Sequence, residues 1–122
     1  MSKPVFSDLL TFSVRRNRKS YALAQLYIAL PLFILICGIA LVVKTNLQTI
    51  ALLPLFILLL FICVVLTVQR LNDIGWSGWL GLGLLLLPIG FFLELALLLI
   101  PGEVGPNKYG PDPLEPPESP AA

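Results

Sequence analysis

The residues best suited to chemistry are two charged side chains in a short polar stretch between apolar segments. The stretch reads QRLNDIGWSGW and covers positions 69–79. Arg70 and Asp73 lie three residues apart, so on a helix they share one face and can form an ion pair. With Arg15 and Arg18, they are candidates for contact with lipid headgroups or with a partner protein. The simpler interpretation is that the pair only stabilises a corner of the fold.

The same stretch holds residues that end and restart helices. Gly75 tolerates a positive φ and can terminate a helix. Ser77 can cap the next helix by accepting hydrogen bonds from its first amides, and Gly78 and Gly81 allow close approach to a neighbouring segment. Trp79 suits the interface between membrane and water. The stretch therefore predicts a helix–loop–helix corner at that interface.

Glu94 is chemically distinctive because it lies inside an otherwise apolar segment. An acidic side chain near the centre of a membrane span costs about 3 kcal/mol on insertion scales. We therefore expect Glu94 to face protein or to be protonated, with Gln25, Lys44 or the Glu94 of another copy as candidate partners. This intramembrane ionisable residue raises one alternative function, that of a small transporter or channel subunit.

The sequence gives little support to catalysis. It contains no His, and Cys37 and Cys63 both lie in apolar segments. It has neither paired carboxylates nor a phosphate-binding Gly loop with Lys. Ser77 is followed directly by Gly78, so GWSGW is not a nucleophile elbow. We expect no catalytic residue, no metal site and no cofactor, and we expect that the protein is not an enzyme.

The elements that position these residues are predicted to lie in a membrane. Of the 122 residues, 57% are hydrophobic and 12% are charged, and the mean hydropathy is +0.92. A soluble fold of this size does not bury so much apolar material. Apolar blocks cover residues 21–43, 50–68 and 79–100, and the first is roughly 34 Å long as a helix, enough to cross a ~30 Å hydrocarbon core. We predict an all-α membrane protein with three transmembrane helices.

The third block allows two topologies because it contains Pro88, Gly90 and Glu94. In the first, residues 79–100 form one kinked transmembrane helix. In the second, the chain turns at residues 88–90 and returns as a re-entrant loop, which brings Glu94 back toward the side that holds Arg70. The turn of such a loop needs its backbone groups satisfied by protein or water rather than by lipid.

The segment before the first block predicts a short helix that lies on the membrane surface. Apolar residues recur at helical spacing from Val5 to Phe12, and a basic cluster follows. Basic residues are held on the cytoplasmic side, so we expect a multi-pass membrane protein with a cytoplasmic N-terminus. Three crossings would put the C-terminal tail outside. The basic residues on which the orientation rests are Lys3, Arg15, Arg16, Arg18, Lys19, Lys44, Arg70 and Lys108.

The C-terminal tail, PGEVGPNKYGPDPLEPPESPAA, is rich in Pro and Gly and does not favour regular structure. Residues 101–113 are expected to fold back onto the end of the bundle as an ordered, turn-rich segment. Residues 114–122 are expected to be disordered. We therefore predict a single membrane domain over residues 1–113.

Three separated stretches resemble motifs of the bacterial family called domain of unknown function 805, whose members are small inner-membrane proteins. The entrance to the first block carries Phe12, Arg15, Arg18 and Tyr21 of the family's first motif, while Val14 and Ala22 depart from it. The second motif is matched by Arg70, Leu71, Asp73, Gly75, Ser77, Gly78 and Trp79, whereas Gln69, Asn72 and Leu80 depart. The third is matched by Pro101, Gly102, Gly105, Asn107, Tyr109, Gly110, Pro111 and Pro113.

The resemblance implies an inner-membrane location and a compact helical protein, but no activity. Asn72 stands where the family usually has His, so a shared function cannot depend on imidazole. We expect a structural or accessory protein whose partners are membrane lipids, another membrane protein or a second copy. Nucleic acid is not an expected partner, since the net charge is only +1. The motif residues with an expected structural role are Gly75, Ser77, Gly78, Trp79, Pro101, Gly102, Asn107, Tyr109 and Gly110.

Overall fold

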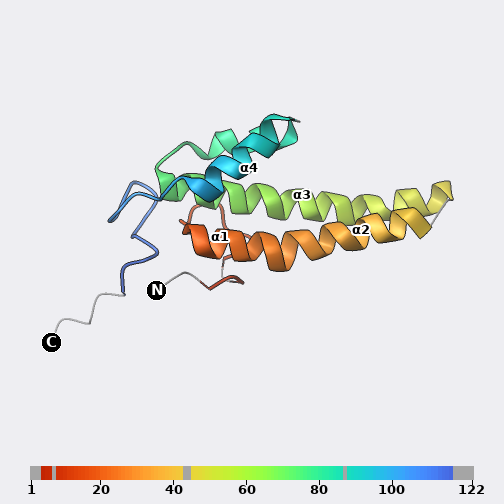
Figure 1. The fold of residues 1–122 in the computed structure, drawn as a ribbon, viewed down its shortest axis with the longest axis horizontal. Helices are drawn as coiled ribbons and strands as arrows, with labels where there is room; N and C mark the ends of the chain where they lie inside the picture. The colour runs from red at the N-terminus through yellow and green to blue at the C-terminus, as the bar shows by residue number, and fades with distance from the viewer. Residues whose placement is uncertain (1–3, 7, 43–44, 87, 117–122) are drawn as a thin grey trace.

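Two long apolar helices form the body of the protein. A computed structural model describes residues 4–6, 8–42, 45–86 and 88–116. Helix α1 (Arg18–Ala24), a π-helical turn η1 (Gln25–Ala29) and helix α2 (Leu30–Val42) run on as one rod, and helix α3 (Asn46–Ile74) lies antiparallel beside it (Figure 1). The segments Arg18–Val42 and Ile50–Ile74 are each long and apolar enough to cross a membrane. All the elements that the structure assigns in the described residues are helical.

The third apolar block is not one helix. A 3-10 helix, η2 (Gly78–Leu85), leads away from the end of α3, and α4 (Ile89–Leu99) returns to that same end (Figure 1). Each arm is only about 16 Å long, roughly half the thickness of the hydrocarbon core. A third full transmembrane helix over residues 79–100 is therefore not confirmed, and the chain has the geometry of the re-entrant alternative.

Local backbone chemistry explains the reversal near Pro88. The amide of Leu86 donates to the carbonyl of Gly83 at 3.1 Å, and the amide of Gly90 donates to that of Leu86 at 2.8 Å. These hydrogen bonds satisfy backbone amides and carbonyls of the turn, which lipid could not do because it offers no hydrogen-bond partners. A Cβ at Gly90 would lie 2.7 Å from the carbonyl oxygen of Leu84, so glycine permits the close approach of the two arms.

The hairpin of η2 and α4 packs on α3 through small residues. A Cβ placed on Gly78 or Gly81 would lie 3.0 Å from the side chain of Val68, so both glycines allow the close approach predicted for them.

Gly75 ends α3 with a left-handed φ of 81°, also as predicted. Ser77 precedes η2 but makes no side-chain capping bond, which corrects its predicted role. Its carbonyl accepts the amide of Leu80 at 3.1 Å instead.

The predicted surface helix at the N-terminus does not form in the described residues 4–6 and 8–17, which adopt turns and extended backbone. Asp8 has a left-handed φ of 54°, which a right-handed helix cannot contain. The side-chain amide of Gln69, on α3, donates hydrogen bonds to the carbonyls of Asp8 and Thr11, at 2.5 and 2.6 Å. The carbonyl of Asp8 also accepts the amide of Thr11 at 3.2 Å, which closes a single turn and does not continue as a helix. Ser7, a residue type that favours the start of a helix, lies outside the described residues.

The buried core sits at the end of the bundle where the hairpin packs. It joins residues from the rod, α3 and α4, and its fully buried members are Tyr21, Ala24, Leu66, Leu71 and Leu97. Many large apolar side chains elsewhere are exposed, including Phe33, Leu41, Ile57 and Phe91. An exposed apolar surface of this extent fits contact with lipid rather than with water. A smaller buried cluster, Ala29, Ile36 and Leu59, joins the rod to α3 farther along the bundle.

The return of α4 puts the described part of the tail at the same end of the bundle as the N-terminal segment, where Arg15 bonds to the carbonyls of Glu103 and Gly105 (Figure 1). We predict that single cysteines introduced by Thr11→Cys and Glu115→Cys, in a chain lacking Cys37 and Cys63, react with a membrane-impermeant maleimide from the same side of the membrane. Asn46→Cys, at the far end of α3, is expected to react from the opposite side. If positions 115 and 46 were labelled from the same side of the membrane, the three-crossing topology would be supported and the hairpin would be contradicted.

Candidate functional site

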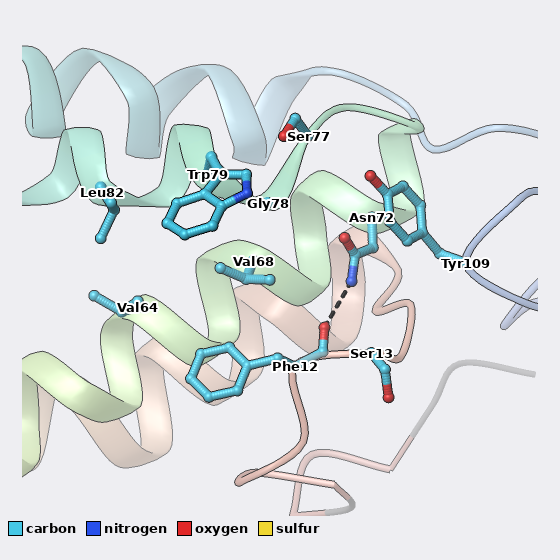
Figure 2. Close-up of a pocket in the computed structure, with 10 residues that line it drawn as sticks. All are labelled: Phe12, Ser13, Val64, Val68, Asn72, Ser77, Gly78, Trp79, Leu82 and Tyr109. Atoms are coloured by element: carbon cyan, nitrogen blue, oxygen red, sulfur yellow. Dashed lines mark hydrogen bonds between the residues drawn. The ribbon is translucent and has the colours of Figure 1, made fainter.

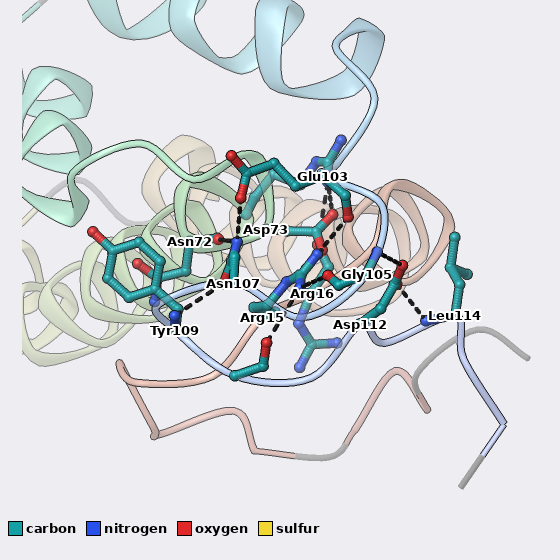
Figure 3. Close-up of polar contacts among 12 residues, drawn as sticks. Arg15, Arg16, Asn72, Asp73, Glu103, Gly105, Asn107, Tyr109, Asp112 and Leu114 are labelled. Carbon is teal, nitrogen blue, oxygen red and sulfur yellow. Dashed lines mark hydrogen bonds and ion pairs between the residues drawn. The ribbon is translucent and has the colours of Figure 1, made fainter. Parts of the chain in front are cut away.

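A buried polar network occupies the end of the bundle where the N-terminal segment, α3, α4 and the tail meet (Figure 3). We call it the polar corner, and it comprises Arg15, Arg16, Gln69, Arg70, Asn72 and Asp73, all of them buried. At its centre Asp73 pairs with Arg70 on the same helix and with Arg15, whose Nη2 lies 3.2 Å from Oδ1 of the carboxylate. The predicted pairing of Arg70 and Asp73 is confirmed, with Arg15 as a second cation.

Arg70 also closes the end of α4. Its Nε donates to the carbonyl of Leu97 at 3.0 Å, and its Nη2 donates to the carbonyl of Ile100. The last carbonyls of a helix lack partners within the helix and carry partial negative charge, so a guanidinium there is stabilising. One side chain of α3 therefore holds the returning arm of the hairpin in place.

Arg15 connects the N-terminal segment to the tail. Its Nη1 donates to the carbonyl of Gly105 at 2.6 Å and its Nη2 donates to the carbonyl of Glu103 at 2.6 Å (Figure 3). A further bond reaches the carbonyl of Gly110 at 3.3 Å. The planar guanidinium presents five donors in a fixed fork, and here it orders a segment that has little regular structure of its own.

Gln69 and Arg16 belong to the polar corner, although Gln69 was noted only as a departure from a motif and Arg16 only as one of the basic residues that set the orientation. The Nε of Arg16 donates to Oε1 of Gln69 at 2.7 Å, and its Nη1 donates to the hydroxyl of Ser20 at 2.7 Å. Burial lowers the pKa of Arg16, and the charge of Asp8 acts in the opposite direction. These contacts fasten the N-terminal segment to α3.

Asn72 was noted in the sequence only as a departure from a motif. Its side-chain amide donates to the carbonyls of Phe12 and Val14, at 2.7 and 3.2 Å. The last turns of α3 carry polar residues at positions 69, 70, 72 and 73, which spread over a wide part of the helix surface. A helix end with so many polar side chains indicates packing against protein rather than against lipid. That signal could have identified Asn72 and Gln69 as buried residues.

The tail is ordered through its own polar residues as well. Asn107 donates from Nδ2 to the carbonyl of Asn72 at 2.9 Å and accepts the amide of Tyr109 at 2.9 Å (Figure 3). Gly102 packs directly on the carboxylate of Asp73, where a Cβ would overlap it. Residues 101–116 therefore have defined turns, while 117–122 of the predicted disordered terminus lie outside the described residues.

Asp112 is held in one orientation within the tail. Its two carboxylate oxygens accept the amides of Gly105 and Leu114, each at 2.9 Å. Desolvation acts to raise the pKa of Asp112, but these two bonds and the nearby charge of Arg15 outweigh it and hold the pKa below its ordinary value. Asp112 is therefore an anion at neutral pH with a fixed position.

Glu94 lies among three neutral hydrogen-bond donors from the rod and α3. The hydroxyl of Tyr21 and Nε2 of Gln25 donate to Oε2, at 2.5 and 2.9 Å, and the hydroxyl of Thr67 donates to Oε1 at 3.1 Å. Glu94 thus faces protein, and Gln25 is one of its expected partners. Lys44, another expected partner, lies outside the described residues.

Two open grooves flank the polar corner. The apolar groove, of about 640 Å³, lies between α3 and η2 and includes Phe12, Val68, Asn72, Trp79 and Tyr109 (Figure 2). Trp79, 80% exposed, projects at its edge, as expected for an interfacial residue. Phe12, Trp79 and Tyr109 come from three stretches far apart in the sequence, and the fold brings them to one surface.

The second groove, of about 730 Å³, lies between the start of the rod and the tail, and we call it the tail groove. Its lining includes Arg18, Lys19, Leu98, Val104 and Asp112. Arg18 and Lys19 are exposed, and Nη1 of Arg18 donates to the carbonyl of Leu99 at 3.1 Å. Basic groups therefore stand beside apolar side chains in an open concave surface.

The structure separates the four residues expected to contact headgroups. Arg15, Arg70 and Asp73 are buried and bonded within the protein, whereas Arg18 is exposed in the tail groove. The buried three organise the fold around the groove. Of the four, Arg18 is the side chain whose placement allows direct contact with an external ligand.

Comparison with protein families identifies the chain's family. A family model described as "Protein of unknown function (DUF805)" matches residues 9–111, which include the polar corner and the first half of the tail. Comparisons with curated proteins and with solved structures found no match to the chain.

Proposed function

The chain belongs to the DUF805 family of proteins of unknown function, and from its geometry we propose that it is an accessory membrane protein that binds a phospholipid headgroup in the tail groove. The observation that carries the proposal is the pairing of two exposed cations, Arg18 and Lys19, with apolar side chains in one open groove. A phospholipid offers the complementary arrangement, with an anionic phosphate directly above its acyl chains.

The groove lies where a headgroup would be. The rod begins at Arg18, so Arg18 and Lys19 stand at the first turn of a helix that is long enough to cross a membrane. Basic residues at this level gain about 1 kcal/mol each from an anionic membrane surface. Leu98 and Val104 add apolar side chains to the lining, against which the upper part of an acyl chain would pack.

The polar corner supports this function by holding the groove's two walls together. One wall is the start of the rod, and the other is the tail, which Arg15 binds through the carbonyls of Glu103 and Gly105. A groove whose walls are already in place loses less entropy when a ligand binds than one that must form on binding.

We propose the bacterial inner membrane as the location, with both termini cytoplasmic. Six of the eight basic residues lie at the end of the bundle that holds the polar corner and the tail, and the other two, Lys3 and Lys44, lie outside the described residues. The positive-inside rule places such an end in the cytoplasm. The six residues are Arg15, Arg16, Arg18, Lys19, Arg70 and Lys108.

A transporter or channel subunit that uses Glu94 has less support. The carboxylate accepts bonds from Tyr21, Gln25 and Thr67, which join it to two neighbouring helices. This arrangement suits a structural fastening of α4. We therefore assign Glu94 to the stability of the hairpin in the proposed function.

The test is lipid retention measured by native mass spectrometry from mild detergent, with phosphatidylglycerol as the probe. We expect the double variant Arg18→Gln, Lys19→Gln to bind the lipid roughly 30-fold more weakly, since two interfacial cations contribute about 2 kcal/mol together. Raising the salt concentration should weaken binding by the unmodified protein. Lys108→Gln is a control for charge, because Lys108 stacks over the ring of Tyr109 and does not line the tail groove.

An equal loss in the control and in the double variant would show that net charge alone attracts the lipid. Unchanged binding by the double variant would refute the tail groove as the binding site. Co-purification of another membrane protein that is lost only in the double variant would assign the groove to a protein partner instead.

A further inference from the structure

We infer that the tail groove selects a phospholipid whose headgroup carries a primary ammonium as well as its phosphate, an inference that rests on the proposed function. The tail groove presents cations and an anion from different segments of the chain. Arg18 and Lys19 come from the start of the rod, and Asp112 comes from the tail, so the two charges belong to different walls of the groove. A zwitterionic headgroup matches both.

The position of Asp112 makes it a suitable partner for an ammonium. Its two oxygens each accept one backbone amide, from Gly105 and Leu114. A carboxylate has about four acceptor sites, so those two bonds fix its orientation and leave capacity for a further donor. Little reorganisation is needed when a ligand arrives, which favours selective binding.

The other two acidic side chains of the lining, Asp73 and Glu103, are directed to partners within the protein. The carboxylate of Asp73 pairs with Arg15 and Arg70. The carboxylate of Glu103 lies against Gly75 and accepts Nδ2 of Asn107 at 2.8 Å, and Figure 3 shows it turned toward Asn107 rather than toward Asp112. Asp112 is held by two backbone amides, which leave acceptor sites on its carboxylate for a ligand at the tail wall.

The chemistry of common headgroups decides between candidates. Phosphatidylethanolamine supplies a phosphate for Arg18 and Lys19 and three N–H donors for Asp112. The trimethylated ammonium of phosphatidylcholine has the same charge but no N–H to donate. Phosphatidylglycerol has no cation, and phosphatidylserine adds a carboxylate that would approach Asp112. The ethanolamine headgroup is the one that satisfies both walls.

The experiment measures competitive retention of lipids by the full chain in mild detergent, using native mass spectrometry with equimolar phosphatidylethanolamine, its mono- and dimethylated forms, phosphatidylcholine and phosphatidylglycerol. We expect phosphatidylethanolamine to be retained about fivefold over phosphatidylcholine and over phosphatidylglycerol, the factor expected of one partly exposed ion pair. Retention should fall stepwise with each methyl group. This series uses the unmodified protein and does not depend on how any variant folds.

Asp112→Asn is expected to abolish the preference while phosphatidylglycerol is still bound, because asparagine loses the negative charge and keeps one of the two acceptor oxygens. Glu115→Gln is the matched control, since Glu115 is an exposed acid of the same segment outside the groove lining. If the unmodified protein retains phosphatidylglycerol and phosphatidylethanolamine equally, and Arg18→Gln, Lys19→Gln weakens both, the proposed function stands and the selectivity for an ammonium is refuted. If that double variant weakens neither, both ideas fall.

Discussion

Asp73→Asn is expected to lower the free energy of unfolding by about 3–5 kcal/mol, the cost of breaking a buried ion pair by removing one partner. Asp73 is the anion that Arg15 and Arg70 share, and the side chains of all three are almost wholly buried. Asparagine has nearly the same shape but leaves two guanidinium groups without a counter-charge. The loss should appear as a lower midpoint of thermal unfolding in mild detergent.

The consequence should extend beyond the substituted helix. Arg15 holds the tail and Arg70 holds the end of α4, so both segments should loosen when Asp73 is neutralised. Hydrogen exchange of the amides in residues 101–112 is expected to accelerate more than that of the middle of α3. Glu115→Gln removes an exposed acid and is expected to change the stability by less than about 0.5 kcal/mol. A loss of stability in Asp73→Asn no larger than in that control would contradict a buried, ionised pair.

Glu94→Leu is expected to destabilise the protein by about 2–3 kcal/mol. Leucine has similar volume but accepts no hydrogen bond, so the hydroxyls of Tyr21 and Thr67 and the amide of Gln25 lose their acceptor. A buried donor left without a partner costs about 1–3 kcal/mol, and the partial exposure of Glu94 reduces the total. Unfolding in detergent, followed by circular dichroism, gives the measurement.

Glu94→Gln serves as the matched variant. Glutamine keeps one acceptor oxygen and the length of the side chain, so its loss of stability should be smaller than that of leucine. Hydrogen exchange of α4 should follow the same order, with leucine the faster. If glutamine and leucine leave stability unchanged but abolish an ion flux in vesicles, the structural assignment of Glu94 fails and the transport role gains its support.

Much of the helical framework could be predicted from local sequence. The first two apolar blocks correspond to the rod and to α3, although the helices run from Arg18 to Val42 and from Asn46 to Ile74 rather than over 21–43 and 50–68. Helix α3 extends beyond residue 68 and includes Arg70 and Asp73, which can be buried in this part of the helix because they pair. Gly75 then ends the helix where its left-handed φ allows.

The candidate site was only partly predictable. The sequence singled out Arg18 and the pair of Arg70 and Asp73, but it did not separate the exposed cation from the buried ions. It placed Lys19 next to Arg18 in the basic cluster, but it carried no signal that Asp112 would share a groove with them. Asp112 lies far from both residues along the chain, and no local periodicity relates it to them.

The sequence by itself determined the apolar composition, the positions of the two long helices and the i, i+3 pairing, because each depends on residues close together in the chain. Tertiary structure alone decided between the two topologies of the third apolar block and determined which side chains hold the tail on the polar corner. Arg15 bonds to residues about 60 to 95 positions away. Backbone carbonyls at helix ends and in turns can accept a hydrogen bond from any suitable donor. The tertiary packing therefore determined which side chains reached these carbonyls.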